Sequence, residues 1–332
     1  LASFIADRGP AVKDVVARLK IISIKKPSAL AKGLWYLQES NQGHKDFQSF
    51  ALPTELRYHA KFAGTNILAF QELASRLEKN FYFYPMSKQQ HLVLDIGNTH
   101  TKYGYFEANA LKESGKCSDW SMNEWASFHQ KAPFTTVLVG SVGASTKQIL
   151  SLLPQSCDVA FIDDTTKYPF TTAYDDINTL GIDRRAALSG AMATHPNTPV
   201  LVIDAGSCIT YDFMDANGHH AGGAISPGRA MRYGALHMFT ANLPLLDPTD
   251  ELPAIGTSTS SSMSMGVEAG VIFEIHAHIE AFNKKYGDFT IILTGGDANF
   301  LIKNIKYTIF ADAELILIGL QNLLMFNTFH EK

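Results

Sequence analysis

Cysteine is scarce in this chain, and long apolar runs are missing from it. The three cysteines, Cys117, Cys157 and Cys208, are far apart and form no CxxC pair, which argues against a disulfide framework or a structural zinc site. No apolar stretch approaches the roughly 20 residues that a membrane span requires. Residues 1–10 lack the apolar core of a signal peptide, so the sequence predicts a cytoplasmic protein with no membrane partner.

The chain also lacks the excess of basic residues that nucleic-acid-binding proteins carry. Its 332 residues include 28 Lys and Arg against 32 Asp and Glu, a net charge of −4, so no nucleic acid partner is expected. The charge is uneven, because residues 1–85 hold 12 basic and 7 acidic side chains, a net of +5. The asymmetry predicts two modules with a boundary near Met86. Residues 1–85, with amphipathic patterns at 10–40 and 66–80, are predicted to be a helical segment of unknown role.

A phosphate-binding GxxxxGK[ST] loop is absent, which argues against a P-loop kinase. From residue 91 onward, short apolar strands instead alternate with amphipathic helices, which predicts an α/β fold. Strands are predicted within 91–97, 99–109 (the hairpin partner of the first), 135–142, 158–164, 199–215 and 289–296, and helices within 145–153, 183–195, 263–287 and 314–326.

One motif occurs twice in this alternating region. An apolar strand reaches an aspartate, which is followed by one further residue, a glycine and a small polar residue, first at Asp95 and again at Asp204, 109 residues later. A duplicated unit of this kind predicts two similar lobes, 86–197 and 198–332, with a cleft between them.

The first copy of the motif suits phosphate binding. Gly97 lets the backbone turn tightly, and small polar residues such as Asn98 and Thr99 can surround phosphate oxygens. Asp95 would repel a bare phosphate but becomes useful with a divalent cation, and Lys102 on the outgoing strand can return toward the phosphates. The alternative is an ordinary Asx-turn in a hairpin.

Repetition of the motif favours the phosphate hypothesis over the turn. Gly206 and Ser207 occupy the matching positions of the second copy, so two loops can grip the two ends of a triphosphate. Further along, Gly295 and Gly296 end a predicted strand, where the absence of side chains permits a flat adenine or ribose to approach.

The segment "GIDRRAALSGA" (181–191) places an acid at a predicted helix start. From spacing alone, Asp183 is best interpreted as a helix cap. The functional alternative is that Arg184 holds a substrate carboxylate while Asp183 accepts a hydroxyl proton during phosphoryl transfer.

Other polar segments give weaker indications. The pair His219–His220 lies in a polar turn and is predicted to be solvated. The serine-rich 256–266 has the composition of a flexible linker, although a loop leading into a helix is the alternative. Residues 222–244 are predicted to form a structured loop and a helix.

Taken together, the motifs of residues 86–330 resemble those of type III pantothenate kinases, within the acetate and sugar kinase/Hsp70/actin superfamily. The matching residues, in chain order, are Asp95–Thr99, Tyr174, Gly181–Arg184, Asp204–Asp212, Gly222–Gly228, Thr240–Pro244 and the 256–270 segment. The resemblance implies two duplicated actin-like (ribonuclease H-like) lobes. It implies ATP-dependent phosphorylation of pantothenate, the first step of coenzyme A biosynthesis. A non-enzymatic regulatory protein on the same fold and a sugar kinase of the superfamily are the alternatives.

The resemblance also implies roles for individual residues. Asp183 is the general base, and the pantothenate pocket is formed by Tyr174, Gly181, Ile182 and Arg184. Thr240 reaches pantothenate from a neighbouring subunit, which implies a homodimer. Phosphate-binding residues are Asp95, Gly97, Asn98, Thr99, Lys102, Gly206, Ser207, Gly295 and Gly296, with Mg²⁺ near Asp95. Asp212 matches the ligand of a monovalent cation, K⁺ or NH₄⁺, and Cys208 replaces an alanine of the family.

Overall fold

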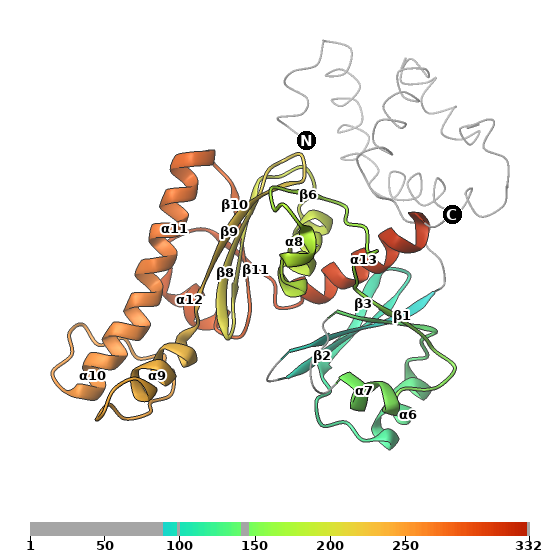
Figure 1. Cartoon of the computed structure of the whole chain (residues 1–332), viewed down its shortest axis with the longest axis horizontal. Coiled ribbons are helices and arrows are strands. Elements are labelled where there is room, and N and C mark those ends of the chain that lie inside the picture. The colour runs from blue at the N-terminus through green and yellow to red at the C-terminus, as the bar shows by residue number, and fades with distance from the viewer. Residues whose placement is uncertain (1–88, 98–99, 141–145, 331–332) are drawn as a thin grey trace, which may run out of the picture. The chain divides into compact units, whose positions relative to one another are not determined.

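The described residues of the computed structural model belong to one compact unit, Lys88–Lys332. They are residues 89–97, 100–140 and 146–330. The predictions made for residues 1–85, Asn98 and Thr99 lie outside this part of the chain. Two β-sheets with helices on their faces make up the described unit (Figure 1).

The first sheet has five strands in the order β3-β2-β1-β4-β5. They are β1 (Gln90–Ile96), β2 (Thr101–Glu107), β3 (Ala110–Lys116), β4 (Thr136–Val139) and β5 (Asp158–Phe161). The first three pair antiparallel, and β4 and β5 run parallel to β1. This lobe therefore consists of an antiparallel meander followed by two parallel strands, each of which is preceded by a helix.

The second sheet repeats that plan in the order β11-β10-β7-β8-β9, with a short sixth strand added at the β9 edge. Its strands are β6 (Thr171–Thr172), β7 (Val200–Ala205), β8 (Cys208–Met214), β9 (His219–Pro227), β10 (Thr290–Thr294) and β11 (Ile309–Ala311). Again three strands form an antiparallel meander and two run parallel to the first. The shared strand order confirms the duplicated α/β lobes predicted from the repeated motif.

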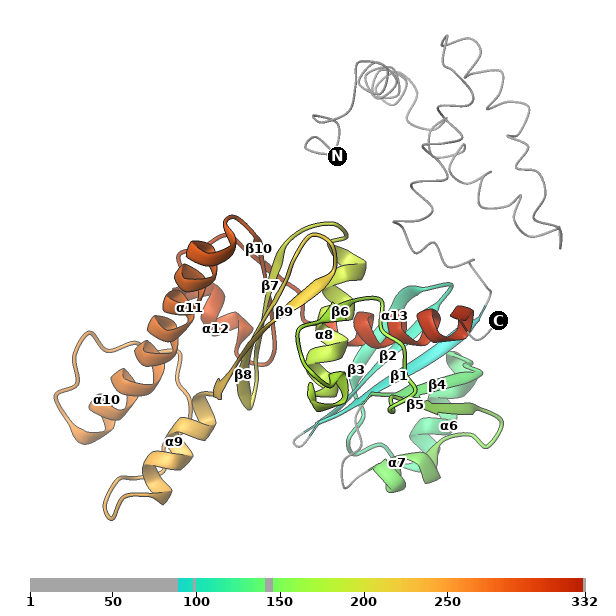
Figure 2. The same ribbon diagram turned by 45° about the horizontal axis from the view of Figure 1, so that its top comes forward.

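Helices lie on the outer faces of the two sheets and between them, while α9 and α10 extend away from the second sheet (Figure 2). They are α6 (Met122–Lys131), α7 (Thr146–Leu152), η2 (Ile177–Thr179), α8 (Ile182–Thr194), α9 (Arg229–Met238), α10 (Thr259–Ser264), η3 (Met265–Ala269), α11 (Gly270–Tyr286), α12 (Ala298–Asn304) and α13 (Leu315–His330). Helices α6 and α7 pack on one face of the first sheet, and α11 and α12 pack on one face of the second. Between the sheets lie α8 and α13.

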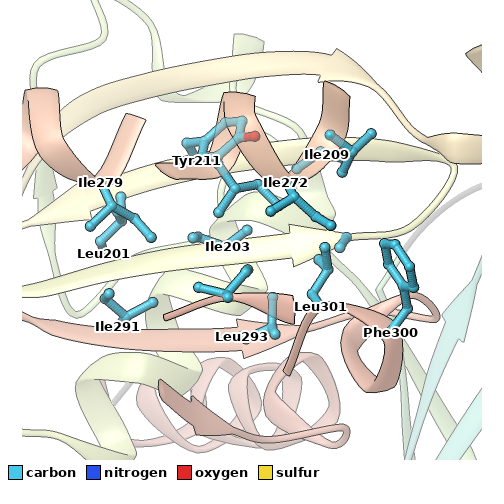
Figure 3. Close-up of a cluster of buried hydrophobic side chains, with 14 of the residues drawn as sticks. Leu201, Ile203, Ile209, Tyr211, Ile272, Ile279, Ile291, Leu293, Phe300 and Leu301 are labelled. Carbon is cyan, nitrogen blue, oxygen red and sulfur yellow. The ribbon is translucent and has the colours of Figure 1, made fainter. Parts of the chain in front are cut away.

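The largest core cluster fills the space between the second sheet and α11 (Figure 3). Alternate residues of β7, Leu201 and Ile203, face Ile272 and Ile279 of the helix, while Val202 faces α8 on the other side. A strand buried on both faces reads as a continuous apolar run, which explains why β7 is easily predicted.

The two central helices cross at glycines. A side chain at Gly190 of α8 would collide with the backbone carbonyl of Leu315, and one at Gly319 of α13 would collide with that of Ala186. The helix backbones therefore lie in direct contact, and together they join the cores of the two lobes.

Some elements differ from the sequence predictions. The serine-rich 256–266 is a loop leading into a helix rather than a linker, because Ser258 and Ser261 form a reciprocal capping box at the start of α10. The single helix predicted over 263–287 includes a π-helical turn, Met265–Ala269. Strand β3 was not predicted, since its residues are mostly polar and it lies at a sheet edge.

Candidate active site

Two aspartates at strand ends face the space between the sheets. Side chains alternate along a strand, so Asp95 shares a face with Val93, which packs toward α13. By the same rule Asp204 shares a face with Val202, which packs toward α8. The repeated motif thus presents an acid from each lobe to the region where α8 begins.

The acids are close enough to influence one another. Burial, the charge of Asp183 and that of Asp95 raise the pKa of the Asp204 carboxyl to about 7, against the counteracting charge of Lys102. Burial also raises the pKa of Asp95, with Lys102 lowering it and Asp183 raising it further. Lys102 lies directly opposite Asp95 in the β1–β2 ladder. A cluster of acids with one lysine is suited to a bound cation and phosphate groups.

Asp204 gives the metal-free protein a measurable pH dependence. Its folded-state pKa of about 7 lies above the ordinary aspartate value of 3.8, so the folded chain binds this proton more tightly than the unfolded chain does. The stability of the folded state therefore falls as the pH rises from about 4 through 7. We expect Asp204→Asn to raise the melting temperature relative to wild type, with a gap that widens from pH 5 to pH 8 in chelator-treated buffer. A gap that narrows with pH in thermal unfolding would contradict this assignment.

The turns after the aspartates are tight. The backbone N–H of Gly97 donates to the carbonyl of His100 at 3.1 Å, and that of Gly206 donates to the carbonyl of Cys208 at 2.9 Å. Gly228 packs so closely on the second turn that an added Cβ would collide with the carbonyls of Gly206 and Ser207. The second predicted phosphate loop is therefore held in place from β9.

Gly295 closes one side of the second acidic site. Its φ of +96° is a conformation that favours glycine, and an added Cβ would collide with Ala205 and with the Asp204 carboxylate. Gly296 has open space around its Cα, and the next N–H, that of Asp297, donates to the carbonyl of Ala205 at 2.9 Å. Both glycines thus lie at the edge of the acidic site; their contact with a nucleotide stays a prediction from the sequence.

Helix α8 begins beside these loops. Gly181 is its N-cap residue, so Asp183 is not the cap that spacing favoured but lies exposed in the first turn. Oδ1 of Asp183 accepts the backbone N–H of Arg184 at 2.8 Å. Ile182 is partly buried against the core between the sheets. An exposed carboxylate is thereby fixed at a helix start, close to the two strand-end acids.

Arg184 is almost fully buried, and its guanidinium donates hydrogen bonds to two residues, Asp212 and Tyr174. Its Nε donates to Oδ2 of Asp212 at 2.9 Å, and its Nη2 donates to Oδ1 at 2.7 Å. Its Nη1 donates to the hydroxyl of Tyr174 at 3.0 Å. This side-on ion pair, predicted from neither spacing nor motif, fixes the orientation of the guanidinium.

Asp212, the predicted ligand of a monovalent cation, is contacted by two side chains of the protein. Its side chain is 1% exposed. Its oxygens accept from Arg184, and Oδ1 also lies 2.9 Å from Nε2 of His220. A cation at this carboxylate would lie against a buried guanidinium, which repels it. Among the described residues, no group of three or more His, Cys, Asp or Glu side chains is arranged to hold a metal ion.

Thr240 lies outside the acidic cluster. It follows α9, which is separate from α8 in both views (Figures 1 and 2). Its hydroxyl donates to the carbonyl of Leu236 at 2.7 Å, and the side chain is exposed. Within this chain its observed role is local, at the end of α9.

Two buried polar groups near the site were missed from the sequence. His220, predicted to be solvated, is 0% exposed. Glu268 is also fully buried, where it accepts from Arg229 and from the Tyr233 hydroxyl. The sequence did carry one sign of this, since Glu268 is an isolated acid within the apolar segment "MGVEAG". A buried acid requires a partner, so this position could have been predicted to form a buried ion pair.

The repeated strand order and the paired acidic loops define an α/β protein of the actin-like class, with a site suited to phosphoryl transfer. The model of the type III pantothenate kinase family matches residues 91–281. The chain belongs to the type III pantothenate kinase family.

Individual relatives are similar over the same region. A type III pantothenate kinase of Flavobacterium psychrophilum is 41% identical over 234 residues, which cover 70% of this chain and 97% of the relative. One from Bacteroides fragilis is 37% identical and covers 71% of this chain and 98% of the relative. A solved structure described as a conserved putative Baf family transcriptional activator from Campylobacter jejuni has a TM-score of 0.47 and 24% identity, and it covers 72% of this chain and 99% of its own. In the described part of the chain, no helix is long and apolar enough to cross a membrane.

Proposed function

We propose that this chain transfers the γ-phosphate of ATP to the primary hydroxyl of pantothenate in the cytoplasm, with Asp183 as the general base. The kinase activity and its two substrates follow from the family. The observation that supports the base is the placement of an exposed Asp183 carboxylate beside buried Arg184 and within electrostatic reach of Asp95 and Asp204. The product is 4′-phosphopantothenate, which enters coenzyme A biosynthesis.

Asp183 suits proton transfer because it is accessible and held. One oxygen accepts the N–H of Arg184, and the exposed side chain can still reach a substrate hydroxyl. Phosphoryl transfer needs little covalent help from the protein, so alignment of the hydroxyl and acceptance of its proton are the expected contributions.

Arg184 suits the carboxylate of pantothenate. A guanidinium has five N–H hydrogens on three nitrogens. Each nitrogen donates to Asp212 or Tyr174, but these bonds do not use all five hydrogens. The remaining N–H groups can donate to a carboxylate in a bidentate pair. Tyr174, Gly181 and Ile182 would complete the pocket around the start of α8.

Cations fit the acids at the strand ends. Their mutual repulsion and raised pKa values are relieved by a positive charge, which supports Mg²⁺ with ATP near Asp95. In this proposal the monovalent cation binds at Asp204 and not at Asp212, because Arg184 holds Asp212, whereas no arginine of the described residues donates a hydrogen bond to Asp204. Bound cations would neutralise phosphate charge, while Gly97, Lys102, Gly206 and Ser207 hold the phosphates.

A homodimer is supported by apolar side chains exposed around the end of α9. Met238 is 75% exposed and Phe239 is 82% exposed, and both precede Thr240 directly. Exposed apolar patches of this kind mark interaction surfaces. A second copy on this surface would bring Thr240 of each chain into the interface.

We expect Phe239→Asp to convert the dimer into a monomer and to reduce turnover. A buried charge at an apolar interface is costly, so light scattering should report half the wild-type mass. Ile302→Asp, at a 45% exposed apolar position on α12, is the matched control and should leave the mass unchanged. A wild-type protein that is monomeric at assay concentrations would contradict the proposal.

The function is tested by coupled ADP release from the full chain with pantothenate, Mg-ATP and KCl. Turnover that depends on pantothenate and falls without K⁺ is expected. A folded protein without turnover would favour a non-enzymatic role, and turnover with sugars that pantothenate does not compete against would favour a sugar kinase. Comparing the activity and stability of residues 86–332 with those of the full chain tests the proposed module boundary. Limited proteolysis of both preparations tests the proposed boundary between the lobes, where cleavage near residue 197 is expected.

A further inference from the structure

His220 is buried beside the residues proposed to bind pantothenate. Its side chain is 0% exposed, and its ring stacks on that of Tyr174 with centroids 5.6 Å apart. A buried imidazole needs a hydrogen-bond partner for each ring nitrogen. The identity of those partners indicates what the residue does.

Both nitrogens of His220 are engaged. Nε2 lies 2.9 Å from Oδ1 of Asp212, and Nδ1 lies 2.9 Å from Oγ1 of Thr172. Because a carboxylate only accepts, Nε2 carries the hydrogen. The hydroxyl of Thr172 can then donate to Nδ1, and its oxygen accepts the backbone N–H of Tyr174 at 3.1 Å.

These contacts form a closed ring of hydrogen bonds. It runs from the backbone of Tyr174 through Thr172, His220 and Asp212 to Arg184. The ring closes where Nη1 of Arg184 donates to the hydroxyl of Tyr174 at 3.0 Å. Within this ring, the imidazole therefore links Thr172 of β6, two residues before Tyr174, to the carboxylate of Asp212 that orients Arg184.

We propose that His220 is a positioning residue of the acceptor pocket. By holding Asp212 and the Tyr174 segment together, it fixes the guanidinium so that its remaining N–H groups face the pantothenate carboxylate. The inference rests on the proposed function, since it assigns a role in the same pocket. Geometry held by such supporting contacts improves substrate binding without participation in the chemical step.

The test is steady-state kinetics of full-length variants. His220→Phe keeps a ring to stack on Tyr174 and removes both polar nitrogens. We expect KM for pantothenate to rise about tenfold, as for loss of a hydrogen bond to a charged group, while KM for ATP stays within about twofold. The inhibition constant of the primary amide of pantothenate, which lacks the charge that Arg184 recognises, should also stay within about twofold. His220→Gln, which can still donate near the position of Nε2, should restore most of the pantothenate affinity.

Matched variants separate this inference from the proposed function. His219→Phe removes an equivalent contact, from Nδ1 to Oγ1 of Thr171 at 2.9 Å, and should leave both KM values unchanged. Arg184→Gln should raise KM for pantothenate, and no change there would refute the pocket itself. If Arg184→Gln raised KM for pantothenate and His220→Phe did not, only the proposed role of His220 would be overturned. The same holds if His220→Phe changed KM for pantothenate and KM for ATP equally. If the Phe variant does not fold, KM for pantothenate is compared between His220→Asn and His220→Gln. The longer Gln side chain is expected to reach Asp212 and the shorter Asn side chain is not, so a higher KM for the Asn variant supports the role of His220 and equal KM values overturn it.

Discussion

Replacing Asp183 by Asn should lower kcat by about a hundredfold or more, because a positioned general base contributes about 10²–10⁴-fold. Asn keeps the size of the side chain and can still accept the backbone N–H of Arg184. It cannot accept the substrate proton. Since the side chain is exposed, we expect the melting temperature to change little.

Asp176→Asn is the matched control for this substitution. Asp176 is also exposed, and its Oδ1 accepts a nearby backbone N–H, that of Asn178, at 2.9 Å. Its kcat should remain near that of wild type. If Asp183→Asn kept more than a tenth of wild-type turnover in the ADP-release assay, Asp183 would no longer be the base.

Gly319→Ala should destabilise the protein strongly. The added methyl group would collide with the carbonyl of Ala186, so α13 and α8 must move apart along their whole contact. Overpacking of a tight core lowers the free energy of unfolding by about 1–3 kcal/mol, and we expect the upper end of this range because the helix backbones must be displaced. For a unit of this size, about 3 kcal/mol lowers the melting temperature by roughly 6–12 °C.

Gly270→Ala gives the opposite control. Nothing lies within 4 Å of a Cβ built at Gly270, at the start of α11. Alanine favours helix over glycine by about 0.5–1 kcal/mol, so the variant should be as stable as wild type or slightly more so. Equal melting temperatures for the two variants in calorimetry would show that the helix crossing tolerates a wider separation.

The fold was predictable because the two lobes repeat one local pattern. The runs that become β1 and β7 are each largely apolar, have an aspartate as the next-to-last residue and are followed by glycine, and these properties depend only on neighbouring residues. The mostly polar β3 offered no such pattern, and it is defined by its pairing with β2.

The site was predictable only where a motif carries the chemistry. Asp95, Asp183 and Asp204 stand out locally, and the structure places them within electrostatic reach of each other. His220 could not be assigned, because its burial depends on β6, an edge strand of two residues, pairing beside it. The partners of Asp212 likewise come from a helix 28 positions away and a strand 8 positions away.

The placement of α13 also affects how the protein is synthesised. This last helix packs Leu317 and Leu320 against Val93 of β1, more than 220 residues earlier in the chain. Until the ribosome has synthesised α13, the apolar face of the first sheet that packs against this helix is exposed. Contacts so distant in sequence form slowly, and exposed apolar surface favours aggregation. The nascent first lobe is therefore expected to be a client of chaperones until the final helix emerges.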